Sequence, residues 1–249
     1  MRALLLTCLL TVPAVASAED PGMPDAASYV ARLDELWKTR DEEASVKATN
    51  DAIREGVRAF PTDYQILWRA SRFRWWEADG EAAEKRKRMV AKEGWNYANR
   101  ALEAKAGGTE AKYYLALSIG AYSQAVGVLK AISEGLEGTF VEALDYAIAH
   151  DEGFDRAGGH TAKGRYWWEL PWIKRDLKKS KAEIEKGLAL HPEHLRNYYY
   201  LAQTLEKDGD KAGARAALEK ALSGADAYDP PEARRVKAWA RAYQGELKD

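Results

Sequence analysis

The stretch LAQTLEKDGDKAGARAALEKALSG, Leu201 to Gly224, places alanines and leucines at helical intervals on both sides of a Gly-Asp pair. The pattern predicts two antiparallel helices, the first starting near Leu195, that meet at a tight turn at Gly209-Asp210. Ala202 and Ala214 are small enough for the two helix backbones to pack closely. The stretch therefore predicts a helical hairpin with a close interface.

The hairpin pattern recurs along the chain. EIEKGLALHP (183–192) and DAIREGVRAFP (51–61) are second helices that end at a proline, which cannot continue a helix. ILWRASRFRWWEADGEAA (66–83) reads as a first helix and FVEALDYAIAHDEGFD (140–155) as a second. A period near 34 residues is typical of tetratricopeptide (TPR) repeats. We predict an all-α, TPR-like helical-repeat solenoid of about five helix pairs, with a long irregular helix in the middle between Glu81 and Lys105.

Smaller features refine this prediction. The clearest predicted helix breaks are Gly107-Gly108 and Gly158-Gly159, and we expect a turn at Asp79-Gly80. The segment ELPWIKRD, 169–176, adds residues between two units. Alternating β-branched and aromatic runs, which indicate strands, do not occur in the sequence.

The N-terminus has the composition of an export signal. MRALLLTCLLTVPAVASA (1–18) has one basic residue, an apolar run and small residues before Glu19. We predict cleavage after Ala18, leaving a single TPR-like domain over residues 19–249. Cys8 is the only cysteine, so the exported part would have no thiol or disulfide. A lipid anchor on Cys8 is the alternative to cleavage.

Composition and motifs exclude several function classes. The 249 residues include 38 basic and 39 acidic side chains, and this near-neutral balance argues against nucleic acid as the main partner. The usual signatures of nucleophile, phosphate and zinc chemistry do not occur. HDEGFDRAGGH (150–160) could bind a metal through His150, Asp151, Asp155 and His160, but such residues are ordinary at a helix end. We expect neither catalysis nor a cofactor or metal.

Cations and aromatic residues recur on the predicted inward face of three first helices. By the repeat register these residues are Arg69, Phe73 and Trp76, then Thr161, Arg165 and Trp168, then Arg196, Tyr199 and Gln203. A guanidinium binds a carboxylate through two parallel hydrogen bonds, and rings desolvate an apolar body. We expect these residues, with His160, to form a site for a small organic acid or apolar molecule. The alternative is that the arginines pair with glutamates of the second helices on a wet surface.

Residues 151–222 resemble a known family. The segment has a glycine-rich turn with a histidine, a small-aromatic helix, a proline-containing loop, a second helix that ends in proline, and a standard repeat. In this it resembles the TRAP-transporter T-component (TatT) family. The resemblance implies a periplasmic helical-repeat protein that works beside the solute-binding component of a TRAP uptake system. Two departures from the family pattern are the signal, which fits soluble export, and Lys163 before Gly164.

Two functional hypotheses follow. The first is a non-enzymatic accessory protein of TRAP-type uptake that contacts a solute-binding protein and binds an organic acid or apolar ligand. The second is an exported TPR scaffold that binds a peptide or protein in its concave groove. A homo-oligomer is compatible with both hypotheses.

Overall fold

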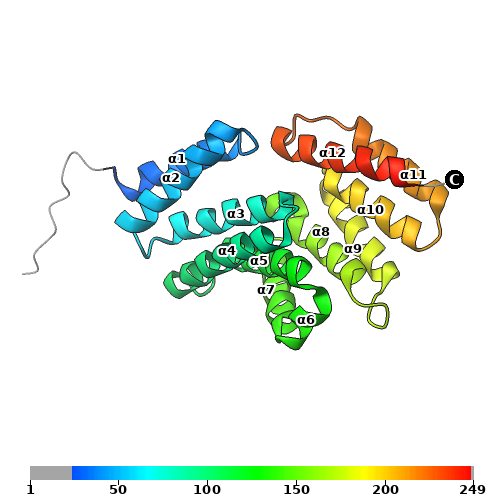
Figure 1. Ribbon diagram of the computed structural model, residues 1–249, viewed down its shortest axis with the longest axis horizontal. Coiled ribbons are helices and arrows are strands. Elements are labelled where there is room, and N and C mark those ends of the chain that lie inside the picture. Colours follow the sequence, from blue (N-terminus) through cyan, green and yellow to red (C-terminus); the bar gives the residue numbers. More distant parts are fainter. Residues whose placement is uncertain (1–23, 248–249) are drawn as a thin grey trace, which may run out of the picture.

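The computed structural model describes residues 24–247, and within this range the chain forms twelve helices and no strand (Figure 1). The helices are α1 (Ala26–Trp37), α2 (Glu43–Ala59), α3 (Tyr64–Gly80), α4 (Glu84–Ala104), α5 (Thr109–Val126), α6 (Val128–Ser133), α7 (Leu136–His150), α8 (Phe154–Glu169), α9 (Leu177–Leu190), α10 (Leu195–Lys207), α11 (Lys211–Ser223) and α12 (Pro230–Glu246). Residues 1–18, with Cys8 and the predicted signal, lie outside the described range.

The helices confirm the predicted repeat solenoid. Successive pairs are α1–α2, α3–α4, α5–α7, α8–α9 and α10–α11, and α12 packs on the last pair. The hairpin of α10 and α11 is the one predicted from the opening stretch. Ala202 and Ala214 are fully buried, Gly209 has the positive φ of +92° that the turn requires, and the Asp210 side chain accepts a hydrogen bond from Gly213 N. Pro61 and Pro192 lie in the turns after α2 and α9.

The irregular segment lies elsewhere than predicted. The long helix α4 has 21 residues and is regular, whereas the third pair contains the short extra helix α6 between Gly127 and Gly135. Both glycines have positive φ values, which end the neighbouring helices. The predicted break at Gly107-Gly108 is confirmed, while Asp79-Gly80 ends α3 just before its turn.

Gly158-Gly159 does not break a helix. Both glycines lie within α8, where a Cβ on Gly158 would stand 2.0 Å from the Tyr113 hydroxyl and one on Gly159 2.6 Å from Ile148 Cγ1. They allow close packing against α5 and α7. The irregular backbone comes just before them, where Asp155, Arg156 and Ala157 form a left-handed turn with φ between 50° and 56°. Such a turn costs a non-glycine residue about 1–2 kcal/mol, so the surrounding packing must hold it.

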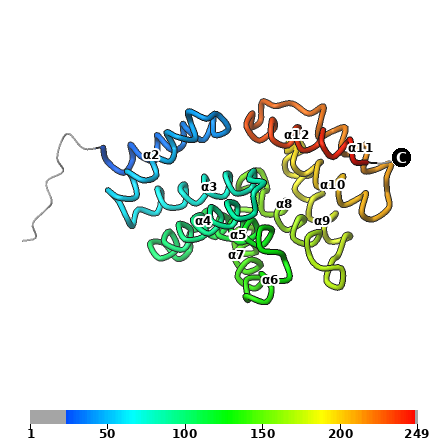
Figure 2. The backbone as a smooth tube through the Cα atoms, in the orientation of Figure 1, coloured from blue at the N-terminus to red at the C-terminus, as the bar shows by residue number. Residues whose placement is uncertain are grey.

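The pairs curve so that the first helices face inward. The largest core cluster joins α3, α4, α5 and α7, and separate clusters fill the N-terminal and C-terminal pairs. In Figures 1 and 2, α1–α2 and α12 lie along the same edge of the molecule, above α3 and α8. None of the helices in the described range is long and apolar enough to cross a bilayer.

Candidate functional site

A pocket of about 150 Å³ lies where the curved helices converge. Its lining comes from the end of α1 and the turn after it, from α3, α5, α6, α7, α8 and α10, and from the residues that start α12. These elements are distant in sequence, and the curvature of the solenoid brings them together. A dry cavity of this size is large enough for a benzene-sized group.

One part of the pocket is apolar. Helices α5, α6, α7 and α8, with the residue after α8, contribute aliphatic and aromatic side chains that include Leu117, Ala121, Val128, Ala131, Ile132, Leu136, Phe140, Tyr166 and Leu170. Tyr166 stacks on Phe140 with ring centroids 5.3 Å apart, and its hydroxyl donates to Glu137. Apolar walls with a few placed polar groups are usual for small-molecule sites.

Arg196 is the centre of the polar part. Its guanidinium donates to both oxygens of Asp79 and both oxygens of Glu232, and to the Tyr200 hydroxyl at 3.4 Å. A guanidinium has five N–H groups, and these contacts use all five. Arg196 therefore joins α10 to α3 and α12, and it has no donor left for a ligand.

The carboxylates keep this buried cluster charged. Burial would raise the pKa values of Asp79 and Glu232, but the Arg196 guanidinium lowers both below their ordinary values. Burial would lower the pKa of Arg196, whereas the two carboxylates raise it well above its ordinary value. Arg235, which also contacts Asp79, has a pKa lowered by burial to about 10. All four groups are charged at neutral pH.

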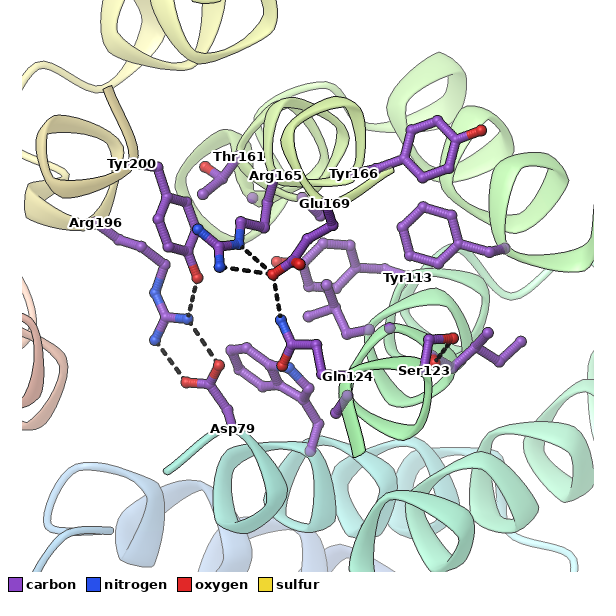
Figure 3. Close-up of a pocket in the computed structure, with 18 of the residues that line it drawn as sticks. Asp79, Tyr113, Ser123, Gln124, Thr161, Arg165, Tyr166, Glu169, Arg196 and Tyr200 are labelled. Carbon is purple, nitrogen blue, oxygen red and sulfur yellow. Dashed lines mark hydrogen bonds and ion pairs between the residues drawn. The ribbon is translucent and has the colours of Figure 1, made fainter. Parts of the chain in front are cut away.

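Arg165 lies beside Tyr200, with its guanidinium carbon 4.9 Å from the ring centroid, and is less constrained than Arg196. Figure 3 shows it on α8 with Glu169, whose carboxylate also accepts a hydrogen bond from Gln124 of α5 at 3.3 Å. Arg165 Nε and Nη2 contact Glu169, and Nη1 donates to Gln203. Two of its N–H groups have no hydrogen bond to another described residue. Arg165 can therefore accept a further anionic partner.

Further cations lie near Arg165, whose own charge is paired with Glu169. Its guanidinium carbon lies 4.0 Å from the Trp168 ring centroid, and Lys207 Nζ lies 3.5 Å from the same ring. Burial, followed by the charges of Arg175 and Arg165, lowers the pKa of Lys207. A carboxylate near Arg165 would relieve this crowding of positive charge.

The structure brings together only some of the residues predicted from the repeat register. Thr161, Arg165 and Arg196 line the pocket. Trp168 and Gln203 are hydrogen-bonded to each other beside it, and Gln203 also contacts Tyr199 and Arg165. These six residues therefore form one continuous region at α8 and α10.

The three residues predicted on α3 do not line the pocket. Arg69 pairs with Asp34 of α1, with Nη2 to Oδ2 at 2.7 Å. Phe73 and Trp76 are buried against Trp37, with ring centroids 5.0 and 6.0 Å from it. The expected convergence of three arginines is therefore wrong for Arg69, because this face of α3 packs on α1 rather than facing inward. The alternative of pairs with second-helix glutamates on a wet surface is also wrong in its partners, because these arginines pair with carboxylates of α1, α3, α8 and α12, and Arg196 is buried.

The histidine cluster is dispersed. His160 is buried between Glu183 and Glu152, with its ring nitrogens 2.7 and 2.9 Å from their carboxylates. His150 stacks on Tyr146, and Asp155 accepts a hydrogen bond from Tyr113. Among the described residues, no group of three or more His, Cys, Asp or Glu is arranged to hold a metal ion.

Several pocket residues escaped the sequence prediction. Tyr200 and Glu169 line the pocket where Tyr199 and Trp168 were expected, each one position further along its helix. Asp79 and Trp75 represent α3 in place of Arg69 and Phe73. The sequence did contain a signal for Glu169 and Tyr200. Each lies four residues after a predicted arginine, Arg165 or Arg196, and residues i and i+4 share a helix face.

Comparisons with known proteins identify the type of fold. The sequence profile of the family described as "Regulator of microtubule dynamics protein 1-3" matches residues 29–241. A solved structure, a thermophilic TPR protein from Thermus thermophilus, superposes with a TM-score of 0.64 at 15% identity. The match covers 88% of this chain and 100% of that one, and at this identity it establishes the fold alone. No curated protein matches the chain significantly.

Proposed function

This chain belongs to the regulator of microtubule dynamics protein 1-3 family and has a TPR-like fold, and from this premise we propose that it is a non-enzymatic scaffold that binds a small amphipathic acid. The family's name describes microtubule regulation in those proteins, and our proposal rests on the pocket of this chain. The acid group would lie at Arg165, and the apolar body would lie against α5, α6 and α7.

The observation that carries this proposal is that one pocket has an apolar part and an arginine with unused donors. Arg196 cannot serve, because its five N–H groups are already paired. A carboxylate at Arg165 would form charge-assisted hydrogen bonds in a half-buried setting. The apolar walls would add affinity in proportion to the ligand surface that they remove from water.

The first experiment separates pocket binding from adhesion to the surface. Val128 lines the pocket, whereas its neighbour Leu129 is 70% exposed and does not. We would titrate the protein by calorimetry with carboxylic acids of increasing apolar length. Val128→Trp should fill the pocket and abolish binding, while the matched variant Leu129→Trp should leave it unchanged. Equal affinities for both variants would contradict the proposal.

A second titration tests the position of the acid group. Arg165→Ala should weaken carboxylate binding by about 1.5–3 kcal/mol, the range for a lost charge-assisted hydrogen bond. Arg69→Ala is the control, because Arg69 pairs with Asp34 outside the pocket and should not change affinity. A neutral ligand of the same shape should bind Arg165→Ala and wild type alike.

The cellular role is a further proposal that rests on the resemblance of residues 151–222. We propose that residues 1–18 direct export to the periplasm and that the partner is the solute-binding component of a TRAP-type uptake system. Intact mass of the exported protein should show a start at Glu19, and retained residues 1–18 or a lipid on Cys8 would contradict it. Mixing the protein with the solute-binding component should give a complex on size-exclusion chromatography. Binding of a peptide, with no binding of small acids, would instead support the alternative of an exported TPR scaffold that binds a peptide or protein in its concave groove.

A further inference from the structure

The loop between α8 and α9 exposes two large hydrophobic side chains. Trp172 is 83% exposed and Ile173 is 75% exposed, the highest values for large hydrophobic residues in the described range. In Figure 1 this loop protrudes at the lower edge of the molecule, as does α6. Exposed adjacent apolar side chains of this size mark an interaction surface when the backbone holds them in place.

The backbone does hold them in place. Lys174 N and Arg175 N both donate to Pro171 O, at 2.8 and 2.9 Å, which forms a tight turn. Arg175 Nε donates to the carbonyl oxygens of Trp168 and Leu170. Lys174 Nζ contacts both Glu137 oxygens at 2.6 Å and ties the loop to α7. Trp172 and Ile173 therefore point outward from a fixed turn.

The residues that follow are strongly basic. Five cations, Lys174, Arg175, Lys178, Lys179 and Lys181, accompany a single acid, Asp176, over residues 174–181. Lys178, Lys179 and Lys181 are exposed, and Lys179 and Lys181 make only long, solvent-exposed pairs with Asp176 at 3.6 Å and Glu185 at 3.8 Å. Arg175 donates to backbone carbonyls, which leave its charge in place. This local excess of positive charge stands out in a chain whose formal net charge is −1.

We propose that residues 171–181, which are the loop after α8 and the first residues of α9, dock the protein on the surface of an anionic lipid bilayer. Trp172 and Ile173 would enter the boundary between headgroups and acyl chains, where tryptophan is favoured. The lysines would contact the anionic headgroups, each contributing to adsorption. We call residues 171–181 the docking loop.

A lipid surface fits the docking loop better than a protein does. Lysine is depleted in the buried centres of protein interfaces, yet it dominates here. Two apolar side chains also cover far less than the roughly 800 Å² per partner that a stable protein interface buries. A bilayer needs only a small apolar insertion beside a cluster of cations.

The docking loop adjoins the pocket. Glu169 and Leu170, which line the pocket, immediately precede it, and Glu137 both lines the pocket and holds Lys174. Docking would therefore bring this side of the pocket close to the bilayer. The inference does not rest on the proposed function, since it uses only the exposure and charge of the docking loop.

Vesicle flotation tests the inference. The full chain would be floated with vesicles of phosphatidylcholine alone and of phosphatidylcholine with phosphatidylglycerol, at low and high salt. Wild type should float with the anionic vesicles and detach at high salt. Trp172→Ala/Ile173→Ala should reduce partitioning about tenfold or more, because both apolar side chains are lost from the interface. Lys178→Glu/Lys179→Glu should reduce it about tenfold or more and remove the preference for anionic lipid.

Matched controls and contrary outcomes make the test decisive. Lys85→Glu/Arg88→Glu alters the other exposed basic run, on α4, and Met89→Ala alters another exposed apolar residue, and both should float like wild type. Failure of wild type to float overturns the inference. Loss of flotation in the α4 variant, or flotation unaffected by Trp172→Ala/Ile173→Ala, assigns membrane binding to another segment and also overturns it. A dimer that Trp172→Ala/Ile173→Ala dissociates, without vesicle binding, would make a second copy the partner instead.

Discussion

At the scale of single residues, buried charges determine how this solenoid closes around its pocket. Arg196, Asp79 and Glu232 come from three helices that are distant in sequence, and each would be costly to bury alone. Together they satisfy one another and keep their charges. The same pairing leaves Arg196 without a free donor, whereas two N–H groups of Arg165 have no hydrogen bond to another described residue. The function of each arginine thus depends on how many of its donors the fold has already used.

Removing Arg196 should be strongly destabilising. Arg196→Met leaves two buried carboxylates without their main partner, and we expect a loss of about 3–5 kcal/mol in the free energy of unfolding. Urea denaturation followed by circular dichroism measures it. Arg234→Ala is the control, because its pair with Asp41 is exposed and should contribute less than about 1 kcal/mol. Similar losses in both variants would show that burial of the Arg196 cluster is unimportant.

His194 should make stability depend on pH. Burial lowers the pKa of this histidine below its ordinary value of 6.5. The unfolded chain therefore binds more protons than the folded one between the two pKa values, so the free energy of unfolding should fall as pH falls below 6.5. His194→Asn should flatten this part of the profile relative to wild type. Urea midpoints of wild type and variant between pH 7.5 and 5 test this, and an unchanged slope in His194→Asn would contradict the assignment.

At the scale of secondary-structure elements, Gly127 and Gly135 flank α6, whose residues line the apolar part of the pocket. Gly135 has φ +79°, and a Cβ there would meet nothing within 4 Å. Any penalty for a side chain at this position is therefore conformational. Gly138, three residues later within α7, also has open space around it but does not have a positive φ.

The stability of the protein should respond in opposite directions to an alanine at Gly135 and an alanine at Gly138. Gly135→Ala should destabilise the protein by about 1 kcal/mol or more, because alanine disfavours the left-handed conformation. Gly138→Ala should stabilise it by about 0.5–1 kcal/mol, the difference in helix propensity. Thermal and urea unfolding of the two variants give both values. Stabilisation by Gly135→Ala would mean that the turn before α7 adopts another conformation.

Helix periodicity explains which parts of the site could be predicted. The hairpins were predictable, because Ala202, Ala214 and the prolines after α2 and α9 act within one repeat. Arg165 and Arg196 both line the pocket, but the aromatic neighbours predicted three residues further along each helix do not, and Glu169 and Tyr200, four residues further along, do. On a helix of 3.6 residues per turn, positions i+3 and i+4 lie on either side of the point one turn above residue i. Tertiary packing decides which of the two faces the pocket.

The left-handed turn at Asp155–Ala157 was beyond sequence reasoning. None of these three residues is a glycine, and the adjacent Gly158-Gly159 pair favoured a break at the wrong place. Contacts from distant segments fix the turn, since Asp155 accepts a hydrogen bond from Tyr113 and Arg156 donates to Tyr228 O. Local propensity carries no information about such contacts.

At the scale of the whole molecule, side chains connect the two ends of the solenoid. Arg40, which follows α1, donates to both oxygens of Asp229, the N-cap of α12, at 2.8 Å. Its guanidinium carbon lies 4.1 and 4.2 Å from the ring centroids of Trp37 and Trp76. Arg234 of α12 pairs with Asp41 beside this contact. Both Arg40 and Asp229 line the pocket, so closure of the curved chain and formation of the pocket are linked.

Breaking this connection should loosen the N-terminal pair before the rest of the molecule. Arg40→Met removes a buried partner of Asp229, and we expect a loss of about 3 kcal/mol in the local opening free energy of α1 and α2, equivalent to about a hundredfold faster amide exchange. Hydrogen exchange measured by mass spectrometry resolves the effect by segment, and α10 and α11 should keep their protection because their own core cluster is untouched. Arg32→Met serves as the control, since its pair with Glu55 is exposed and joins only α1 to α2. If Arg40→Met raised exchange equally in all helices, the contact would support global stability alone, and the two ends would not open as a separate unit.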